Sequence, residues 1–210
     1  MRKLSLLTLF IALATLFTSC EISDDQLAQR LKGAWAGESI VNGKKAKMEY
    51  QYFESTDGKT GKFVEITHLS VSDTLNGTEY VMPYKAYVGG DYSINNGLFS
   101  ITYLPETIQI VFDKDAINSY AQAFIANENG KENSEFANTT PEELAASIIE
   151  SGTKELSSDM KSFYFDYNEL KPDGYENLRI SENKMSFMTS DVAKVEFNRM
   201  GNDILEEYPY

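Results

Sequence analysis

The sequence predicts a mainly β protein, an antiparallel barrel or sandwich that is interrupted by a helical insertion. Apolar and polar residues alternate from about residue 34 to 113 and again from about 178 to 197, which is typical of half-buried strands. Turn signals separate these segments at intervals of roughly 8 to 14 residues, as in a β meander. Between the two regions, at about 114–175, the apolar residues recur at helical spacing instead.

The first 19 residues are predicted to be a lipoprotein signal peptide. Two basic residues precede an apolar run, Leu4 to Phe17, which has the length of a signal-peptide core and is too short to span a bilayer. Leu16-Phe17-Thr18-Ser19-Cys20 resembles the bacterial lipobox, where the chain is cut before the cysteine and the thiol is acylated. Cys20 is the only cysteine, so no disulfide partner exists. The alternative is an ordinary signal peptide with an incidental cysteine.

Acyl chains on Cys20 would anchor the protein to a membrane, because each buried CH₂ contributes about 0.8 kcal/mol. The acidic stretch that follows, residues 21–25, resembles the surface-export signal of lipoproteins in Bacteroides-type bacteria. Its alternative role is a solvated linker or a helix N-cap. We therefore expect an outer membrane lipoprotein that faces the periplasm or the cell surface, with the surface favoured.

The charge of the chain excludes one class of partner. Without residues 1–19 the chain keeps 17 basic and 32 acidic residues, a net charge of −15. A domain of this sign repels the phosphate backbone, so we expect no nucleic-acid binding. About 190 residues are enough for one domain with its own core.

The elements begin with a short helix at residues 24–32, whose apolar residues share one face. Gly33 is expected to end it as a C′ glycine, so that residues 20–33 form an anchor linker with this helix and residues 34–210 the barrel domain. Asn-Gly pairs and other turn residues punctuate the segments that follow, with a break expected at Gly89-Gly90. Strands are expected at about 48–52, 63–71, 80–88, 98–103, 107–113, 178–180, 185–187 and 193–197.

Two helices are predicted in the insertion. Residues 115–127 carry an apolar stripe at helical spacing. Thr140-Pro141-Glu142-Glu143 has the chemistry of a helix start, with Thr as N-cap, Pro at N1 and Glu at N3. Gly152 is expected to break this second helix, and apolar residues as far as Phe163 would extend it beyond the break.

Two short motifs carry a resemblance to a known family. Leu31-Lys32-Gly33-Ala34-Trp35 resembles the Gly-x-Trp opening of lipocalins, and Val195-Glu196-Phe197-Asn198-Arg199 resembles their last strand. The resemblance implies an up-and-down barrel of about 8 to 10 strands, in which Trp35 closes one end and Arg199 packs across it. Arg199 has the phase of Val195 and Phe197, and a cation–π contact of about 0.5–2 kcal/mol would compensate an inward Arg. The alternative for Trp35 is an ordinary core residue.

Together with the lipobox, these motifs resemble the lipocalin-like lipoproteins of Bacteroides-type bacteria. The helical insertion is not part of the pattern of small lipocalins. The resemblance therefore does not fix the number of strands or the presence of a cavity.

No catalytic residue, metal site or cofactor is expected. His68 is the only histidine, and the sequence has no Gly-x-Ser-x-Gly, phosphate-loop or EF-hand motif. Glu49 and Glu65 on neighbouring strands leave a glycoside hydrolase as a third hypothesis. Asp73-Thr74-Leu75 resembles an O-glycosylation motif of exported proteins in these bacteria, which makes Thr74 a candidate modification site; the alternative is a plain turn.

Four tyrosines are the candidate ligand-binding residues. Tyr50, Tyr52, Tyr80 and Tyr84 lie at same-face positions of alternating strands, and each offers a ring and a hydroxyl to an amphipathic ligand. The alternative is that they fill the barrel.

We therefore expect non-enzymatic binding of a small amphipathic or apolar ligand, or of a glycan. The alternative function is an envelope protein–protein interaction module, such as an inhibitor or an accessory subunit, with a filled barrel and the helical insertion or strand edges as its contact surface.

Overall fold

The computed structural model describes residues 22–41, 44–53, 55, 57–129, 134–171, 173–188 and 194–201. The predicted signal peptide and Cys20 lie outside these residues. Within the described ranges, no helix combines the length and the apolar character needed to cross a membrane.

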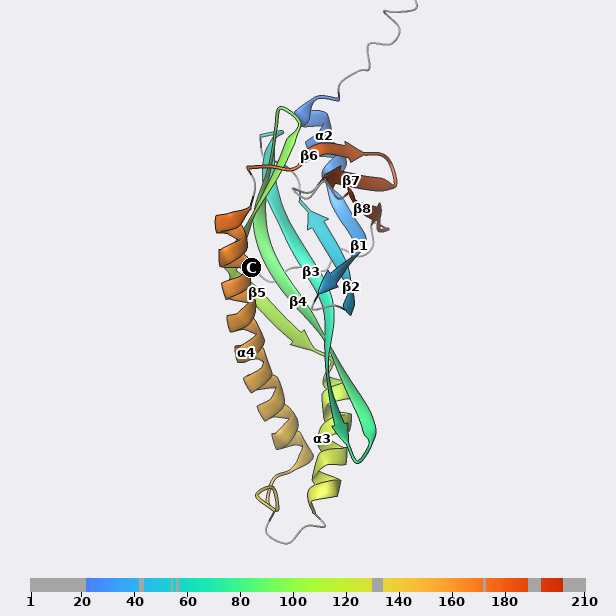
Figure 1. The fold of residues 1–210 in the computed structure, drawn as a ribbon, viewed down its shortest axis with the longest axis vertical. Coiled ribbons are helices and arrows are strands. Elements are labelled where there is room, and N and C mark those ends of the chain that lie inside the picture. The colour runs from blue at the N-terminus through green and yellow to red at the C-terminus, as the bar shows by residue number, and fades with distance from the viewer. Residues whose placement is uncertain are drawn as a thin grey trace, which may run out of the picture.

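In the described residues, eight antiparallel strands form one sheet in the order β5-β4-β3-β2-β1-β8-β7-β6. The sheet curls into a half-barrel (Figure 1), and the fold is mainly β, as predicted. The strands are β1 (Gly33–Val41), β2 (Lys44–Tyr52), β3 (Thr60–Leu75), β4 (Thr78–Asn95), β5 (Leu98–Phe112), β6 (Glu176–Ile180), β7 (Lys184–Met188) and β8 (Lys194–Arg199). The helices are α2 (Asp24–Leu31), α3 (Lys114–Glu128) and α4 (Pro141–Leu170).

Two Asn-Gly turns set the register of the long central strands. Asn76-Gly77 joins β3 to β4, and Asn96-Gly97 joins β4 to β5. All four residues have positive φ, between 50° and 81°, as a two-residue type I′ hairpin turn requires. Both predicted turns are confirmed.

Two predicted breaks in these strands are wrong. β4 continues through Gly89-Gly90. Glycine is required at position 90 for packing and not for a turn, because a Cβ there would lie 2.4 Å from Phe63 Cε1 and would keep this ring off the backbone. β5 likewise runs as one strand through Pro105. The irregularity there is a register shift opposite Tyr87 and Gly89, which accommodates a proline that has no N–H to donate.

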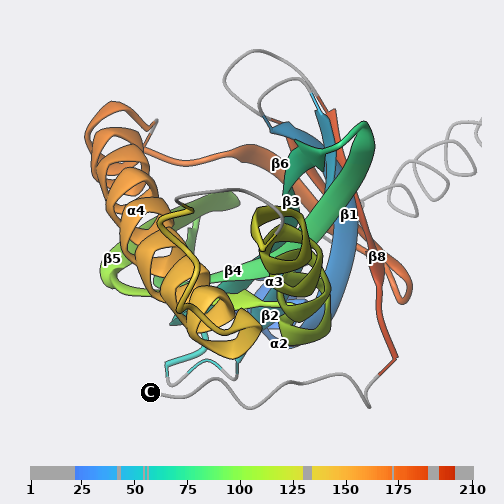
Figure 2. The ribbon, with the colours of Figure 1, turned by 90° about the horizontal axis from the view of Figure 1, so that it is seen from below.

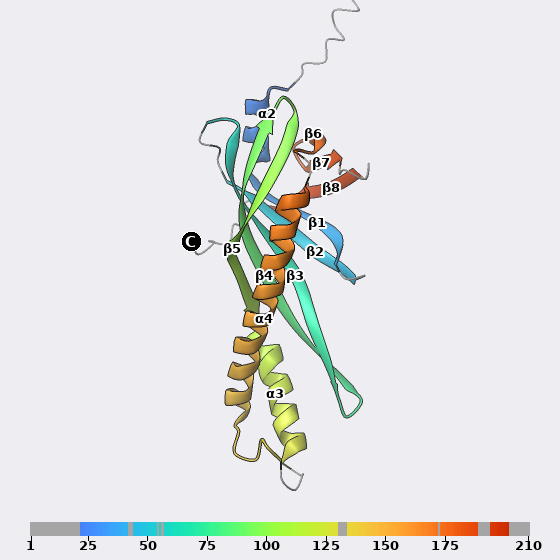
Figure 3. The same cartoon turned by 60° about the vertical axis from the view of Figure 1, so that its left-hand side comes forward.

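The two edges of the sheet approach each other at one end. Phe99 N donates to Tyr175 O at 3.0 Å, and Tyr175 N donates to Phe99 O at 2.7 Å, which joins the start of β5 to the residue before β6. Away from this bridge α4 packs along β5 and stands beside the concave face (Figure 3). Seen from below, α3 and the first part of α4 lie at this end of the molecule, and the curved sheet lies behind them (Figure 2).

The helical insertion starts as predicted but is not broken where expected. Thr140 caps α4 in a capping box with Glu143, and both bonds satisfy N-terminal donors. The predicted break at Gly152 is wrong, because α4 continues to Leu170. A Cβ at Gly152 would lie 3.0 Å from Phe112 Cζ, so the glycine allows close packing of α4 on β5.

The short helix α2 covers the end of the half-barrel opposite α3 (Figure 1). Its apolar face is buried, and a capping box between Ser23 and Gln26 starts the helix. The Asp24 carboxylate accepts hydrogen bonds from Asn96 N at 2.8 Å and Gly97 N at 3.0 Å. The predicted helix is confirmed, and this carboxylate fixes it to the turn between β4 and β5.

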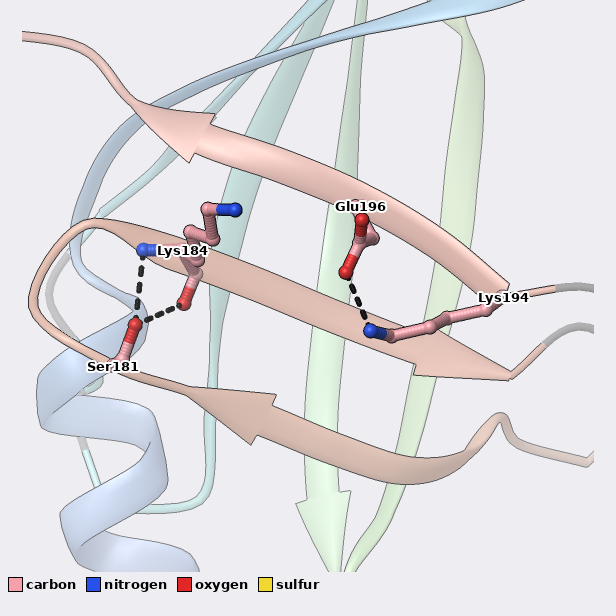
Figure 4. Close-up of polar contacts among 4 residues, drawn as sticks. All are labelled: Ser181, Lys184, Lys194 and Glu196. Carbon is pink, nitrogen blue, oxygen red and sulfur yellow. Dashed lines mark hydrogen bonds and ion pairs between the residues drawn. The ribbon is translucent and has the colours of Figure 1, made fainter.

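The last three strands form a small antiparallel unit (Figure 4). Ser181 N donates to Lys184 O at 2.8 Å. Lys184 N donates to Ser181 Oγ at 3.1 Å, and Ser181 Oγ donates to Lys184 O at 3.2 Å, which closes the turn between β6 and β7. Lys194 and Glu196 pair on the exposed side of β8. Such an exposed pair contributes little to stability.

Candidate functional site

A cavity of about 290 Å³ lies between the concave face of the sheet and α4. It is bounded mainly by aromatic rings and by two acidic side chains, and none of the described residues that line it is basic. The lining residues are Glu38, Met48, Tyr50, Glu65, Ile101, Tyr103, Phe163, Tyr164, Tyr167, Tyr175, Phe187, Val195 and Phe197. Pockets for small molecules have this character, with mostly apolar walls and few polar groups.

Glu65 is the polar centre of this cavity. It lies on β3 in phase with Phe63 and Thr67, so its side chain points to the concave face, where it is 2% exposed. Its Oε1 accepts from Tyr164 Oη at 2.7 Å and from Thr67 Oγ1 at 3.1 Å. Its Oε2 accepts from Tyr103 Oη at 2.5 Å. Three hydroxyl groups from three elements therefore hold the carboxylate in place.

The tyrosines around Glu65 remain protonated over the physiological pH range. Burial, and next the negative charge of Glu65, raises the pKa of Tyr103 and of Tyr164 well above the ordinary value of 10.0. The pKa of Tyr50 is raised by the same two causes. These hydroxyls therefore stay neutral and can donate hydrogen bonds.

Aromatic rings form the remaining walls. The ring centroids of Tyr103 and Tyr164 are 4.4 Å apart, and those of Tyr50 and Phe197 are 5.2 Å apart in an edge-to-face arrangement. Tyr167 meets Tyr103 edge to face at 5.2 Å, and its hydroxyl contacts that of Tyr175. The contacts of Tyr164 and Tyr167 hold α4 against β5 and against the residue before β6, and together these rings bring several faces to one cavity.

The structure separates the four tyrosines predicted to bind a ligand, although all four lie on the concave face. Tyr50 lines the cavity. Tyr52 is 2% exposed and packs edge to face on Tyr92, so it is part of the core. Tyr80 and Tyr84 lie further along β4, where their rings contact Tyr120 and Phe112 respectively. Of the four, Tyr50 is thus the one that lines the cavity, and ligand binding by the other three stays a prediction.

The structure brings Trp35 and Arg199 together at the end of the half-barrel that α2 covers. The Arg199 Cζ lies 4.1 Å from the centre of the Trp35 ring. Trp35 is completely buried, and its Nε1 donates to Leu31 O at 2.7 Å. Gly33 must be glycine here, because its φ is +116° and a Cβ would lie 2.8 Å from Arg199 Nη1.

Other predicted positions lie outside the cavity. Thr74 is an exposed residue of β3, just before the turn to β4, and Cys20 lies outside the described residues. Glu49 points to the opposite face of the sheet from Glu65, since it pairs with Ile66 in the register. It contacts Lys47 and lies 3.0 Å from His68 Nε2. The two acids of the glycosidase hypothesis therefore do not converge.

The described part of the chain contains no group of three or more His, Cys, Asp or Glu residues with metal-ligand geometry. The sequence interpretation missed Glu65 as a binding residue, and with it Tyr103 and Tyr164. One signal was present, because Glu65 has the phase of Phe63 and Leu69 on a strand whose inward positions are otherwise mostly apolar. A charged residue at an inward position points to a built polar site.

The fold and the cavity define a class: an antiparallel half-barrel with an aromatic cavity under a long helix. Comparison with protein-family models, with curated proteins and with solved structures finds no match to this chain.

Proposed function

We propose that this protein binds a small amphipathic ligand, without catalysis, in the cavity between the sheet and α4. The observation that carries the proposal is a cavity of about 290 Å³ with aromatic walls and a hydrogen-bonded carboxylate at one point of the wall. Rings supply apolar contact area, and a few fixed polar groups orient the ligand. A purely apolar ligand would leave the polar wall unused, so we favour an amphipathic one; a glycan is the other occupant to test.

The proposed setting is the bacterial envelope. Cys20 in its lipobox would carry the lipid anchor, and the barrel would be a lipocalin-like lipoprotein of the Bacteroides type, at the periplasmic or the external face of the outer membrane. The contact of Trp35 with Arg199 supports this resemblance. An acylated N-terminus would hold the cavity close to the membrane, where amphipathic molecules are concentrated.

A second function has an observation in its favour. Phe163 and Leu170 of α4 are 61% and 85% exposed and, being seven residues apart, share one face of the helix; exposed apolar clusters often mark contact surfaces. This helix would then contact another envelope protein, with the protein as an inhibitor or accessory subunit. The cavity favours the first function, because a protein contact does not require an aromatic interior with a buried carboxylate.

Native mass spectrometry of the purified chain tests the first function. The protein is measured after gentle purification and again after exposure to envelope lipid and glycan extracts. We expect a retained small mass, and that mass identifies the ligand class. A clean unliganded mass under both conditions contradicts ligand binding and favours the protein-contact function.

A matched pair of variants assigns any retained mass to the cavity. Val195→Trp places a large ring in the cavity and is expected to abolish the retained mass, because Val195 lines it. Val81→Trp adds the same ring at a position of β4 that is 51% exposed and is expected to leave the retained mass unchanged. Retention by both variants would place the bound molecule elsewhere.

A further inference from the structure

The two buried acids of the described chain differ in how their charge is balanced. Glu49, 6% exposed, contacts Lys47 and His68. Glu65, 2% exposed, forms no ion pair with any Lys, Arg or His of the described residues, and its partners there are the hydroxyls of Thr67, Tyr103 and Tyr164. Hydroxyl donors satisfy the hydrogen bonding of a carboxylate but leave its charge uncompensated.

The surroundings of Glu65 are suited to a cation. The faces of aromatic rings carry negative electrostatic potential and attract cations, most strongly where water is excluded. Tyr50, Tyr103, Tyr164 and Phe197 bring four rings to the same cavity. The raised pKa of Tyr103 and of Tyr164, caused by burial and then by Glu65, keeps these two hydroxyl groups neutral, so that both donate hydrogen bonds to the Glu65 carboxylate.

The other residues that line the cavity also favour a cation over an anion. Glu38, the second acidic lining residue, is exposed and pairs with Lys45 at 3.3 Å, so it adds no uncompensated charge inside. No described lining residue is basic. An anionic headgroup or a fatty-acid carboxylate would therefore meet the negative charge of Glu65 without a counter-ion.

We propose that the ligand of this cavity is an organic cation, with an ammonium group placed against the aromatic rings beside Glu65 and an apolar part along the remaining wall. This inference rests on the proposed function, since it names the chemical class that the same cavity takes. Glu65 supplies the charge, and the tyrosine hydroxyls hold its carboxylate in position. The ammonium group can belong to a free amine or to a lipid headgroup, which share this chemistry.

Isothermal titration calorimetry with two isosteric probes tests the charge. Benzyltrimethylammonium carries the cation, and neopentylbenzene has the same shape with carbon in place of nitrogen. With the full chain we expect the cation to bind about tenfold or more tightly than the neutral isostere, as a desolvated cation–π site beside a carboxylate implies. In Glu65→Gln, which keeps the side-chain shape, we expect this preference to fall by about threefold or more, because only the aromatic rings then attract the cation, while the neutral probe binds as before.

Glu196→Gln is the matched control, because it removes a carboxylate that lies outside the cavity, is exposed and is already paired with Lys194; the preference should persist in it. A second measurement does not depend on the folding of any variant. In the wild-type chain, the N-methyl protons of the bound cation should show nuclear Overhauser contacts to the rings of Tyr103 and Tyr164.

The outcomes separate the two proposals. Equal binding of both probes to the wild type would keep the cavity as a ligand site but would overturn the proposal that its ligand is a cation. Glu65 would then have a structural role only. Binding of neither probe, with a clean unliganded mass in the experiment above, overturns the ligand-binding function itself. Where the cation is preferred, binding of a phosphocholine lipid but not of choline or simple amines assigns the ammonium group to a lipid headgroup, and the reverse assigns it to a free amine.

Discussion

The Arg199 guanidinium carbon lies 4.1 Å from the centre of the Trp35 ring. The same guanidinium donates to three backbone carbonyls, Glu182 O at 2.8 Å, Lys32 O at 2.8 Å and Arg30 O at 2.6 Å. These carbonyls belong to the end of α2, the residue that follows it, and the turn between β6 and β7. One side chain thus joins the helix at the end of the half-barrel to the first and last strands, and the planar, forked geometry of Arg makes this possible.

Trp35→Ala is expected to lower the free energy of unfolding by about 3–5 kcal/mol, the cost of removing a large, fully buried aromatic side chain. The indole also gives Arg199 its stacking surface and donates to Leu31 O. Urea unfolding followed by circular dichroism measures the change, because the variant lacks the only Trp. Val81→Ala, at a site 51% exposed, should stay within about 0.5 kcal/mol. An equally small effect at Trp35 would contradict its role in closing the half-barrel.

Features of the fold that depend on local chemistry could be predicted from the sequence. Each Asn-Gly turn needs positive φ at both residues, and few residue pairs satisfy that need as well. Thr140 with Glu143 defines a helix start in the same local way. The predicted breaks at Gly89-Gly90 and Gly152 failed because those glycines serve tertiary packing against Phe63 and Phe112, which local sequence does not reveal.

The candidate site was less predictable, for a related reason. Strand alternation correctly placed Tyr50, Tyr80 and Tyr84 on one face, but it carries no information about position along the half-barrel. The cavity exists where α4 brings Tyr164 to Glu65, a contact between residues far apart in the sequence. The path of α4 over β5 determines that contact, and no short motif encodes it.

Asp24→Ala is expected to destabilise the fold by roughly 1–3 kcal/mol, because the carboxylate accepts from the N–H groups of Asn96 and Gly97. Asp25→Ala is the control: it removes the same charge from the same helix turn, where the helix dipole alone contributes about 0.3–1 kcal/mol. The difference between the two variants in urea unfolding isolates the bonds to the turn. Equal effects would mean that α2 is held by its apolar face alone.

Asp57 is expected to make stability depend on pH in the acid range. The backbone N–H groups of Lys59 and then Thr60 lower the pKa of its carboxyl to about 2, from an ordinary 3.8. Because the folded pKa is below the unfolded one, this contribution is present above about pH 4 and is lost as the pH falls through about 2. Asp57→Asn should therefore be less stable than the wild type at pH 6, and the gap should close towards pH 2. Thermal unfolding across this range measures it, with Asp159→Asn, an exposed acid of α4, as the control for the lost charge; a gap that persists at pH 2 would contradict the assignment.

Tyr164→Phe is expected to lower the free energy of unfolding by roughly 1.5–3 kcal/mol, because it removes a donor to a buried carboxylate while keeping the ring. Tyr80→Phe is the matched control, since the Tyr80 hydroxyl has no hydrogen bond to another described residue and its ring contact with Tyr120 is kept. A double-mutant cycle with Glu65→Gln isolates the pair: the Tyr164→Phe cost should shrink once the carboxylate charge is gone. If Tyr164→Phe costs the same in both backgrounds, the hydroxyl acts independently of Glu65, and the attachment of α4 to β3 must come from ring packing alone.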